Sequence, residues 1–373
     1  MVHATASRRI GINALYLIPG RVGGTEIYLR HLLQALAIID SANRYFVFTN
    51  RETGEDLVPQ SENFTHVPQP VRAAFRPARL LWEQTGLPLH AARLNLDVLL
   101  NPGFTAPLLC PCPQVTVFHD LQHKRHPEYF RWFDVPFWNF FLFWSAHLSQ
   151  LLLADSDATA ADLRAYYRLP DSKIRVAWLG VDQAFFPLAA RRRPEPFLLT
   201  VSTLHPHKNL AGLLRAFAMF RQTHPEFRLV VCGLHGFSSG PLHDLRQSLG
   251  LADAVAFLGW IPRKALHDLY ARAWAFVFPT LFEGFGLPVL EALAAGIPTA
   301  CSAIEPVAGI AADAALQFDP TDPAAMAAAM TRVAGDPELR ERLSAAGPLR
   351  AAQFTWKATA EVTLAALLEV CSE

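Results

Sequence analysis

Short apolar runs rich in β-branched and aromatic residues recur along the chain and alternate with amphipathic segments. In the first half, these runs are residues 9–17, 45–49, 96–100, 114–120, 150–156 and 173–179. In the second half, they are residues 197–202, 227–233, 254–259, 275–279 and 298–302. Strands that alternate with helices in this way, in two successive series, predict two doubly wound parallel sheets.

The segments between the runs have the spacing of helices. Thr25 is a plausible N-cap for a helix that carries Ile27, Leu32 and Leu36 on one side. Further helices are expected over residues 209–221, near Asp244 and from Arg263, and the stretch FFPLAARRRPEP interrupts the alternation as a linker would. We therefore expect a first domain over residues 1–187, a linker over 188–196, a second domain over 197–353, and a C-terminal helix over 354–373 that packs back toward the first domain.

Composition narrows the class of protein. At 373 residues the chain is too long for one ordinary core, and 51% apolar residues supply two cores without disorder. Basic and acidic residues both number 33, and this balance argues against a nucleic-acid partner. The N-terminus lacks a convincing secretory signal, and Cys110 and Cys112 lie too close together for an easy bridge. These features favour a cytoplasmic protein with reduced thiols.

The stretch FEGFGLPVLEALAAGIP holds two glutamates, Glu283 and Glu291, in apolar and glycine-rich surroundings. Burying carboxylates there is costly unless a polar partner meets them. The stretch follows a predicted strand, Gly286 permits a tight turn, and Leu287 begins a helix whose free amides suit a phosphate. Ionised carboxylates accept hydrogen bonds from sugar hydroxyls. The stretch therefore predicts a site for a phosphorylated polyhydroxy compound at the carboxyl ends of the strands.

This stretch closely resembles the Glu, seven residues, Glu signature of the retaining glycosyltransferases of the family-four, mannosyltransferase-like type. Three further stretches resemble segments of the same family, namely VSTLHPHKNL, FLGWIPRKALHDLYARAWAFVFPTLFEG and VFHDLQHKRHPEYF, and FTW near residue 355 resembles its C-terminal signature. The resemblance covers nearly the whole chain. It implies an α/β protein of the GT-B architecture, in which two Rossmann-like domains face each other across a cleft.

The resemblance also implies roles for residues of the second domain. Glu283 would bind hydroxyls of the donor sugar, together with the amides around Phe285 and Gly286. Lys208 would bind the nucleotide's diphosphate and neutralise it as the leaving group departs.

The resemblance assigns the ribose and the base to two other positions. Glu291 would bind the ribose, and Ile261 would offer backbone contacts to the base. The free amides of the helix that starts at Leu287 are expected to bind the nucleotide's phosphates.

In the first domain, the resemblance points to one loop and one histidine. Gly23 and Gly24 would form a loop that lets the backbone approach the diphosphate or the acceptor. His119, at the end of the predicted strand 114–118, would face the reacting sugar and complete a catalytic set with Glu283 and Lys208. The spacing of His119, His123 and His126 also allows a zinc site, but a strand end and a proline-interrupted loop are a poor ligand set, and we expect no metal.

Two departures from the family pattern involve charge. His205 and His207 stand beside Lys208 where many relatives carry arginine, so diphosphate binding could depend on pH. Downstream of the signature, Ala308-Gly309 replaces Pro-Glu, and Glu305 lies further upstream. These departures concern donor contacts and leave the reaction class unchanged.

The implied function is a retaining, metal-independent hexosyltransferase without a cofactor. The expected reaction moves mannose from GDP-mannose, the nucleotide-sugar donor, to a glycan or lipid-linked oligosaccharide acceptor in polysaccharide biosynthesis. Two alternatives are a nucleotide-sugar epimerase of the same architecture and an inactive sugar-nucleotide-binding protein. A dehydrogenase is disfavoured because no G-x-G-x-x-G follows either domain's first strand.

The aromatic segment over residues 130–154 leaves two interpretations open. Charged and polar residues and Pro136 interrupt it, so it lacks the roughly 20 apolar residues of a membrane span. One interpretation is a core helix between domains followed by a buried strand. The other is a weak peripheral contact with the inner face of the membrane through Phe137–Trp144, with part of the helix face exposed.

Overall fold

The computed structural model describes residues 7–20, 23–233 and 239–371. The chain divides into two compact units. The first unit comprises Met1–Gly180 and Thr355–Glu373, and the second comprises Val181–Phe354. Residues 188–196, the predicted linker, lie within the second unit, where they include the end of one short helix and the start of a strand.

The first unit is built on a seven-stranded parallel sheet with the order β3-β2-β1-β4-β5-β6-β7. Its strands are β1 (Arg9–Ala14), β2 (Arg44–Thr49), β3 (Phe64–Pro68), β4 (Val98–Asn101), β5 (Gln114–Phe118), β6 (Leu151–Ala154) and β7 (Ile174–Val176). Every residue of β4, β5 and β6 is buried. Strands covered on both faces need apolar side chains on both sides, which explains why these segments are runs rather than alternations.

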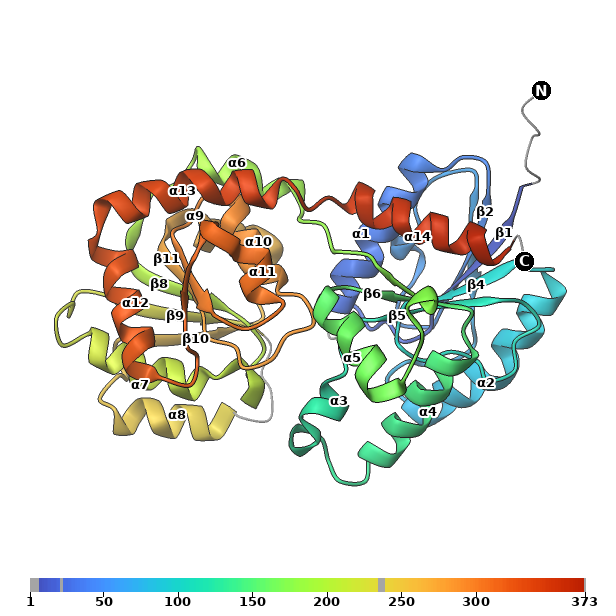
Figure 1. Ribbon diagram of the computed structural model, residues 1–373, viewed down its shortest axis with the longest axis horizontal. Helices are drawn as coiled ribbons and strands as arrows, with labels where there is room; N and C mark the ends of the chain where they lie inside the picture. Colours follow the sequence, from blue (N-terminus) through green and yellow to red (C-terminus); the bar gives the residue numbers. More distant parts are fainter. Residues whose placement is uncertain (1–6, 21–22, 234–238, 372–373) are drawn as a thin grey trace. The chain divides into compact units, whose positions relative to one another are not determined.

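Helices cover both faces of this sheet. They are α1 (Gly24–Ile39), α2 (Arg76–Arg93), α3 (Gln122–Arg125), α4 (Val135–Leu148), α5 (Asp157–Tyr167) and α14 (Trp356–Val370). Figure 1 shows α1 and α14 on one face and α2 and α4 on the other. The predicted N-cap at Thr25 is wrong, because Gly23 caps α1 with φ 60° and its carbonyl accepts a hydrogen bond from the amide of Glu26 at 3.1 Å.

The second unit contains a six-stranded sheet with the order β10-β9-β8-β11-β12-β13. Its strands are β8 (Glu195–Val201), β9 (Arg228–Cys232), β10 (Val255–Gly259), β11 (Ala273–Phe278), β12 (Thr299–Ser302) and β13 (Leu316–Phe318), and all the pairings between them are parallel. Its helices are α6 (Phe186–Ala189), α7 (Leu210–Phe220), α8 (Ser239–Ser248), α9 (Arg263–Arg272), α10 (Leu287–Ala294), α11 (Val307–Ala311), α12 (Pro323–Gly335) and α13 (Pro337–Ala351).

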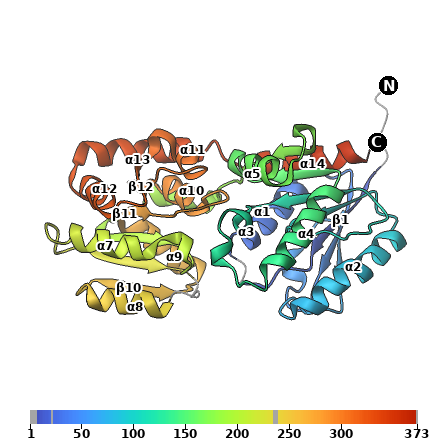
Figure 2. The ribbon, with the colours of Figure 1, turned by 60° about the horizontal axis from the view of Figure 1, so that its bottom comes forward.

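The helices of the second unit also form two layers. In Figure 1, α7, α8 and α12 lie on one side of the sheet, and α9, α10 and α13 lie on the other. Figure 2 shows α8 beside the edge strand β10. The main core lies between the sheet and the first of these layers, where Leu213, Phe217 and Met330 are fully buried.

The predicted fold class of two doubly wound parallel sheets is confirmed, and each predicted strand corresponds to a strand of the structure. The prediction missed β3 and β13. Both are edge strands, one containing a proline and a histidine and the other only three residues long. Edge strands need little apolar surface and tolerate proline, so their sequences carry a weak signal.

Candidate active site

In the second unit, hydrogen bonds connect the loop after β8 to the loop after β11. Both strands are neighbours in the sheet, so their carboxyl ends lie at the same edge. The carbonyl oxygen of His207 accepts hydrogen bonds from the amide of Leu281 at 2.7 Å and from Oγ1 of Thr280 at 3.1 Å. This connection brings together the two side chains on which the predicted donor site depends.

Lys208 and Glu283 form an ion pair at this edge. Nζ of Lys208 donates to Oε1 of Glu283 at 2.5 Å, and only 15% and 11% of the two side chains are exposed. Both charges are therefore stabilised by each other in a largely dry environment. A lysine ammonium has three donors, so Lys208 can bind a phosphate oxygen while it keeps Glu283 as a partner.

The two histidines beside Lys208 stack on each other with their ring centroids 5.7 Å apart. Burial, aided by the charge of Lys208, lowers the pKa of His205 below its ordinary value. His205 is therefore neutral at physiological pH and adds no positive charge beside Lys208.

Helix α10 begins directly after this pair. Gly286 has φ 117°, a conformation that other residues rarely adopt, and it lets the chain turn into the helix. Phe285 is buried against the edge of the Phe354 ring. Among the described residues no side chain caps the helix, so its first turn, beginning with the amide of Leu287, can offer donors to an anionic ligand.

Glu291 lies inside α10 and is 8% exposed. The hydroxyl of the fully buried Tyr270 donates to Oε2 of Glu291 at 2.9 Å. Burial raises the pKa of Glu291 to about 7, although the Tyr270 hydrogen bond and the charge of Arg263 act against this rise. Near neutral pH this carboxylate can therefore accept a hydroxyl or carry a proton itself.

Ile261, the residue expected to contact the base, lies in the loop between β10 and α9. It is half-buried and follows Trp260, which is exposed. The structure thus places Ile261 at the carboxyl edge of the same sheet, two strands from β8.

In the first unit, His119 directly follows β5, and each of its two ring nitrogens contacts a hydrogen-bond acceptor. Its Nδ1 lies 2.6 Å from Oδ2 of Asp155, and its Nε2 lies 2.9 Å from the carbonyl oxygen of Pro102. A carboxylate and a carbonyl only accept, so the ring satisfies both as an imidazolium. Burial disfavours this charged form, but the charge and hydrogen bond of Asp155 outweigh burial and raise the pKa of His119.

Packing fixes the orientation of the His119 ring. Its side chain is buried between the rings of Tyr28 and Phe104, both edge-on with centroids 5.0 Å away. In addition, Oγ1 of Thr159 donates to the His119 carbonyl at 3.2 Å. The histidine is therefore held on several sides and has little freedom to rotate.

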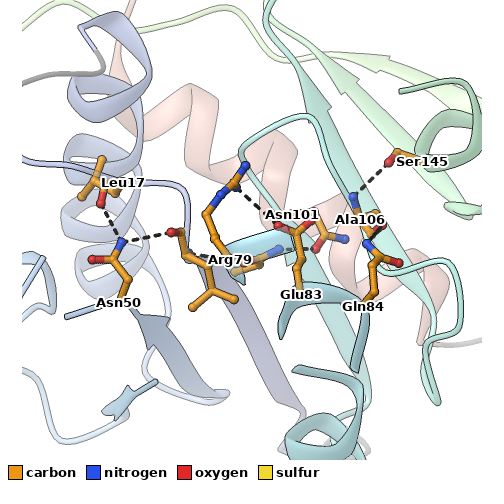
Figure 3. Close-up of polar contacts among 10 residues, drawn as sticks. Leu17, Asn50, Arg79, Glu83, Gln84, Asn101, Ala106 and Ser145 are labelled. Carbon is orange, nitrogen blue, oxygen red and sulfur yellow. Dashed lines mark hydrogen bonds and ion pairs between the residues drawn. The ribbon is translucent and has the colours of Figure 1, made fainter. Parts of the chain in front are cut away.

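The loop that carries Pro102 and Phe104 is itself anchored by two helices. Figure 3 shows Gln84 of α2 and Ser145 of α4 on either side of Ala106. Nε2 of Gln84 donates to the Ala106 carbonyl at 3.1 Å, and Oγ of Ser145 accepts from the Ala106 amide at 2.9 Å. The groups that position His119 are therefore fixed before any ligand binds.

Asp155 is a candidate site residue that the sequence interpretation missed. It is the first residue after β6, the neighbour of β5, in the same position relative to its strand as His119. The sequence did carry a signal for Asp155, because it is a polar residue immediately after a buried strand. The carboxyl ends of neighbouring parallel strands lie at one edge of the sheet, where such residues come together.

Gly23 and Gly24 lie at the start of α1 and are exposed. Apart from its chain neighbours, a Cβ atom at either position would meet no atom of the described residues within 4 Å, so the positive φ of Gly23 is what favours glycine there. Their predicted role at the diphosphate or acceptor stays a prediction.

The three candidate zinc ligands have separate partners. His119 contacts Asp155, Nε2 of the buried His123 lies 2.9 Å from the hydroxyl of Tyr167, and His126 lies beside Glu128. Within residues 7–20, 23–233 and 239–371, no cluster of three or more histidine, cysteine or acidic side chains is arranged to hold a metal ion.

The aromatic segment forms α4 and the buried strand β6. Phe140 and Trp144 on α4 are 49% and 40% exposed, whereas Phe141 packs against a core cluster that includes the buried Leu142. The expectation that part of this face is exposed is confirmed. In the part of the chain that the structure describes, every helix is too short or too polar to cross a membrane.

Comparisons with known proteins identify the family and the fold of the chain. The family model "Glycosyltransferase Family 4" matches residues 22–185, and "Glycosyl transferases group 1" matches residues 183–350. The chain is 30% identical to O-antigen chain mannosyltransferase B of Escherichia coli in an alignment 254 positions long that covers 65% of this chain and 67% of that protein.

Two further similarities extend over nearly the whole chain. An MMP alpha-(1->4)-mannosyltransferase of Mycolicibacterium hassiacum is 27% identical over 92% of this chain and 94% of its own length. The crystal structure of Anabaena HepE in complex with UDP and glucose superposes with a TM-score of 0.74 at 17% identity and covers 97% of this chain and 99% of that one. The chain therefore has the GT-B fold and belongs to the group 1 glycosyl transferases, of the family-four type.

Proposed function

We propose that the protein is a retaining hexosyltransferase that transfers mannose from GDP-mannose to a glycan or a lipid-linked oligosaccharide. Membership of the glycosyltransferase family supports the reaction class. Mannosyltransferases among its relatives support the choice of sugar, and an O-antigen enzyme among them supports polysaccharide assembly as the setting.

The observation that carries the proposal is the Lys208–Glu283 ion pair at the start of α10. Lys208 and the Leu287 amide supply positive potential for a diphosphate, while Glu283 supplies an acceptor for sugar hydroxyls next to it. Glu291, further along the same helix, supplies an acceptor for a ribose. A nucleotide sugar contains the same three groups, because its diphosphate links the sugar to the ribose.

In the proposed reaction, the acceptor hydroxyl attacks the anomeric carbon on the face from which the diphosphate leaves. The bond from the anomeric carbon to the diphosphate oxygen breaks, the new glycosidic bond forms, and the hydroxyl proton passes to the departing phosphate oxygen. Lys208 stabilises the charge that develops on the diphosphate.

His119 supports this proton route. An imidazolium held by Asp155 and Pro102 has no lone pair with which to take a proton, so His119 does not serve as the general base. Its proposed part is to hold a fixed positive charge and a rigid surface toward the reacting sugar. The proposed independence from metal ions follows from the charges that Lys208 and the helix amides already provide.

A peripheral position at the inner face of the membrane completes the proposal. Phe140 and Trp144 are exposed aromatic side chains on one face of α4, and aromatic rings of this kind favour the boundary between lipid and water. Such a contact would bring a lipid-linked acceptor near the enzyme.

The test is a panel of nucleotide sugars, measured first by the shift in melting temperature and then by transfer to acceptors. We expect GDP-mannose to stabilise the protein most, because a ligand that binds only the folded state raises its melting temperature. Slow donor hydrolysis with retained anomeric configuration would support transfer. A change of the sugar's configuration without transfer would instead identify an epimerase, and stabilisation without any turnover would identify an inactive binding protein.

A further inference from the structure

The second unit contains a cavity of about 760 Å³ that is lined by four arginines. Arg191, Arg192 and Arg193 come from the segment between α6 and β8, and Arg272 ends α9. Cavities of this size hold small-molecule ligands in many proteins. The cavity lies apart from the proposed donor site, and the concentration of positive charge calls for an explanation.

The cavity lies at the edge of the sheet opposite to the proposed donor site. Its lining includes Glu195, the first residue of β8, and Arg272, which directly precedes β11. Lys208 and Glu283 follow the other ends of the same two strands. A six-residue strand such as β11 spans roughly 20 Å, so one small ligand cannot occupy both sites.

Among the residues that the structure describes, acidic side chains neutralise one of the four arginines. Arg272 donates to both carboxylate oxygens of Glu195 at 2.8 and 2.9 Å and to Oδ2 of Asp268 at 2.8 Å. Glu195 and Asp268 are also the acidic residues that line the cavity. Within residues 7–20, 23–233 and 239–371, Arg191, Arg192 and Arg193 form no ion pair, so the cavity has an excess of positive charge.

Two buried polar atoms on the lining side chains lack hydrogen-bond partners in the part of the chain that the structure describes. Nη2 of Arg192 donates to the carbonyl of Ala273 at 2.8 Å, but its Nη1 is buried and has no hydrogen-bond partner among the described residues. Nε2 of His267 is likewise buried and without a partner there. Leaving such groups unsatisfied is costly, so a shift of either side chain toward a polar ligand in the cavity would be favourable.

Both side chains have a defined charge at neutral pH. Burial, together with the charge of Arg340, lowers the pKa of Arg192 to about 10, so Arg192 remains positive. Burial and the charge of Arg263 lower the pKa of His267, so its ring is neutral. The cavity therefore combines fixed positive charges with one neutral nitrogen that can donate or accept a hydrogen bond.

We propose that this cavity is a second anion site, which binds a small molecule through a phosphate group. Guanidinium groups match phosphate oxygens in pairs and are less strongly hydrated than lysine, so they bind phosphate well at a partly buried site. The volume leaves room for a body of about the size of a sugar attached to that phosphate. This site does not depend on the identity of the donor or on the proposed reaction.

The test measures binding of inorganic phosphate by titration calorimetry in a Lys208→Ala background, which removes the phosphate-binding lysine of the donor site. We expect binding in the millimolar range and a loss of at least tenfold in affinity in the Arg191→Ala, Arg193→Ala double variant. Arg192→Lys keeps a charge but loses the paired donors, and it should weaken binding as well. Arg332→Ala removes an exposed arginine from α12 of the same unit and should leave binding unchanged.

A second arm separates a free phosphate compound from a lipid headgroup. Vesicles that contain phosphatidate are sedimented with the protein in a Phe140→Ser, Trp144→Ser background, so that α4 does not contribute. Vesicle binding that depends on Arg191 and Arg193 assigns the site to a headgroup, whereas vesicle binding that is independent of them leaves a soluble phosphate compound as the ligand. Phosphate binding that is absent, or unchanged in both arginine variants, overturns the proposal while leaving the glycosyltransferase assignment intact.

Discussion

His119 and Asp155 are 36 residues apart in the sequence, yet Nδ1 of His119 lies 2.6 Å from Oδ2 of Asp155. The sheet explains this proximity. β5 and β6 are neighbours in parallel register, with Phe118 opposite Ala154, and each of the two site residues comes next after its strand. The pair therefore depends on backbone pairing that is already in place, and its geometry is as rigid as the sheet.

The first prediction is that Asp155→Asn lowers the pKa of His119, because it removes the carboxylate that stabilises the imidazolium. His119 resonances followed by NMR across pH should show the shift, and turnover should fall by about tenfold or more if the charge acts on the reaction. Asp56→Asn, which changes an exposed carboxylate of the same unit, is the matched control. An unchanged His119 titration in Asp155→Asn would exclude this role.

The same pair affects stability in a defined pH window. Because the folded-state pKa of His119 is raised, its contribution is complete below the ordinary value of 6.5 and is lost as pH rises through the raised value. Denaturant titrations at several pH values should show this loss in the wild type, and Asp155→Asn should reduce it.

The second prediction is that Glu283→Gln lowers turnover far more than nucleotide affinity, by about 100-fold or more. Its carboxylate is assigned to the sugar, whose charge changes most in the transition state, whereas the nucleotide is held elsewhere. Steady-state kinetics and titration with a nucleoside diphosphate provide the comparison, and Glu338→Gln on the exposed face of α13 is the control. Equal losses in both measurements would show that Glu283 is not a sugar ligand.

The third prediction concerns Lys208→Ala. It should weaken binding of the nucleoside diphosphate and the donor about tenfold or more and leave the bare nucleoside unaffected, because the lost charge faces the phosphates. It also leaves Glu283 without its partner, so the protein should unfold more easily, and adding Glu283→Gln should restore part of that stability. Lys264→Ala on α9 is exposed and serves as the control. A matching loss of nucleoside affinity would make the lysine structural.

The fourth prediction uses the pKa of Glu291, which burial raises from 4.5 to about 7. The folded protein binds this proton more tightly than the unfolded chain, so stability should fall by about 3 kcal/mol as pH rises from 4.5 through 7. Glu291→Gln should remove this component, whereas Glu341→Gln on the exposed side of α13 should retain it. Chemical denaturation across this range measures the slope.

Glu291 also links nucleotide binding to pH. A ribose hydroxyl donates a stronger hydrogen bond to an ionised carboxylate than to a neutral carboxyl group, so affinity for the nucleoside should rise between about pH 6 and 8 in the wild type and stay flat in Glu291→Gln. An affinity that falls over this interval would show that the protonated form of Glu291 binds the ribose.

The fifth prediction separates the two sides of α4. Phe141→Glu should destabilise the first unit by several kcal/mol or cause aggregation, because Phe141 packs against the core. Phe140→Glu with Trp144→Glu should remain folded, because both side chains are exposed, and should bind anionic vesicles less than the wild type. Co-sedimentation and circular dichroism provide the two readouts. A wild type that never sediments with vesicles would exclude the membrane contact.

Much of the second unit was predictable from the sequence, because the patterns that specify its strands, turns and helices involve residues close together in the chain. The run that forms β11, the glycine turn and the start of α10 at Leu287 are adjacent in the chain, so their positions follow from short-range patterns. The Lys208–Glu283 contact was not predictable in the same way. It spans 75 residues and depends on β8 and β11 being neighbours, which only the strand order reveals.

The burial and charge of ionisable side chains were also not predictable from the sequence. The pKa of Glu291 depends first on its burial and then on the opposing hydrogen bond from Tyr270, and the charge of His119 depends on Asp155 and Pro102. The environment of the arginines at 191–193 was not predictable either. A basic run near prolines has the pattern of a solvated linker, and only the structure shows that residues of α6 and α9 line a cavity with it.

The hydrogen bonds to the His207 carbonyl have a consequence for engineering. They join the segment that carries Lys208 to the segment that carries Glu283, so neither can be remodelled alone. If one segment were replaced by that of a relative with another donor, its backbone would not match the hydrogen-bonding groups of the remaining segment. Changing the donor preference of this scaffold therefore requires a cassette in which both segments are transplanted together, with Leu281 and Thr280 kept in register with residue 207.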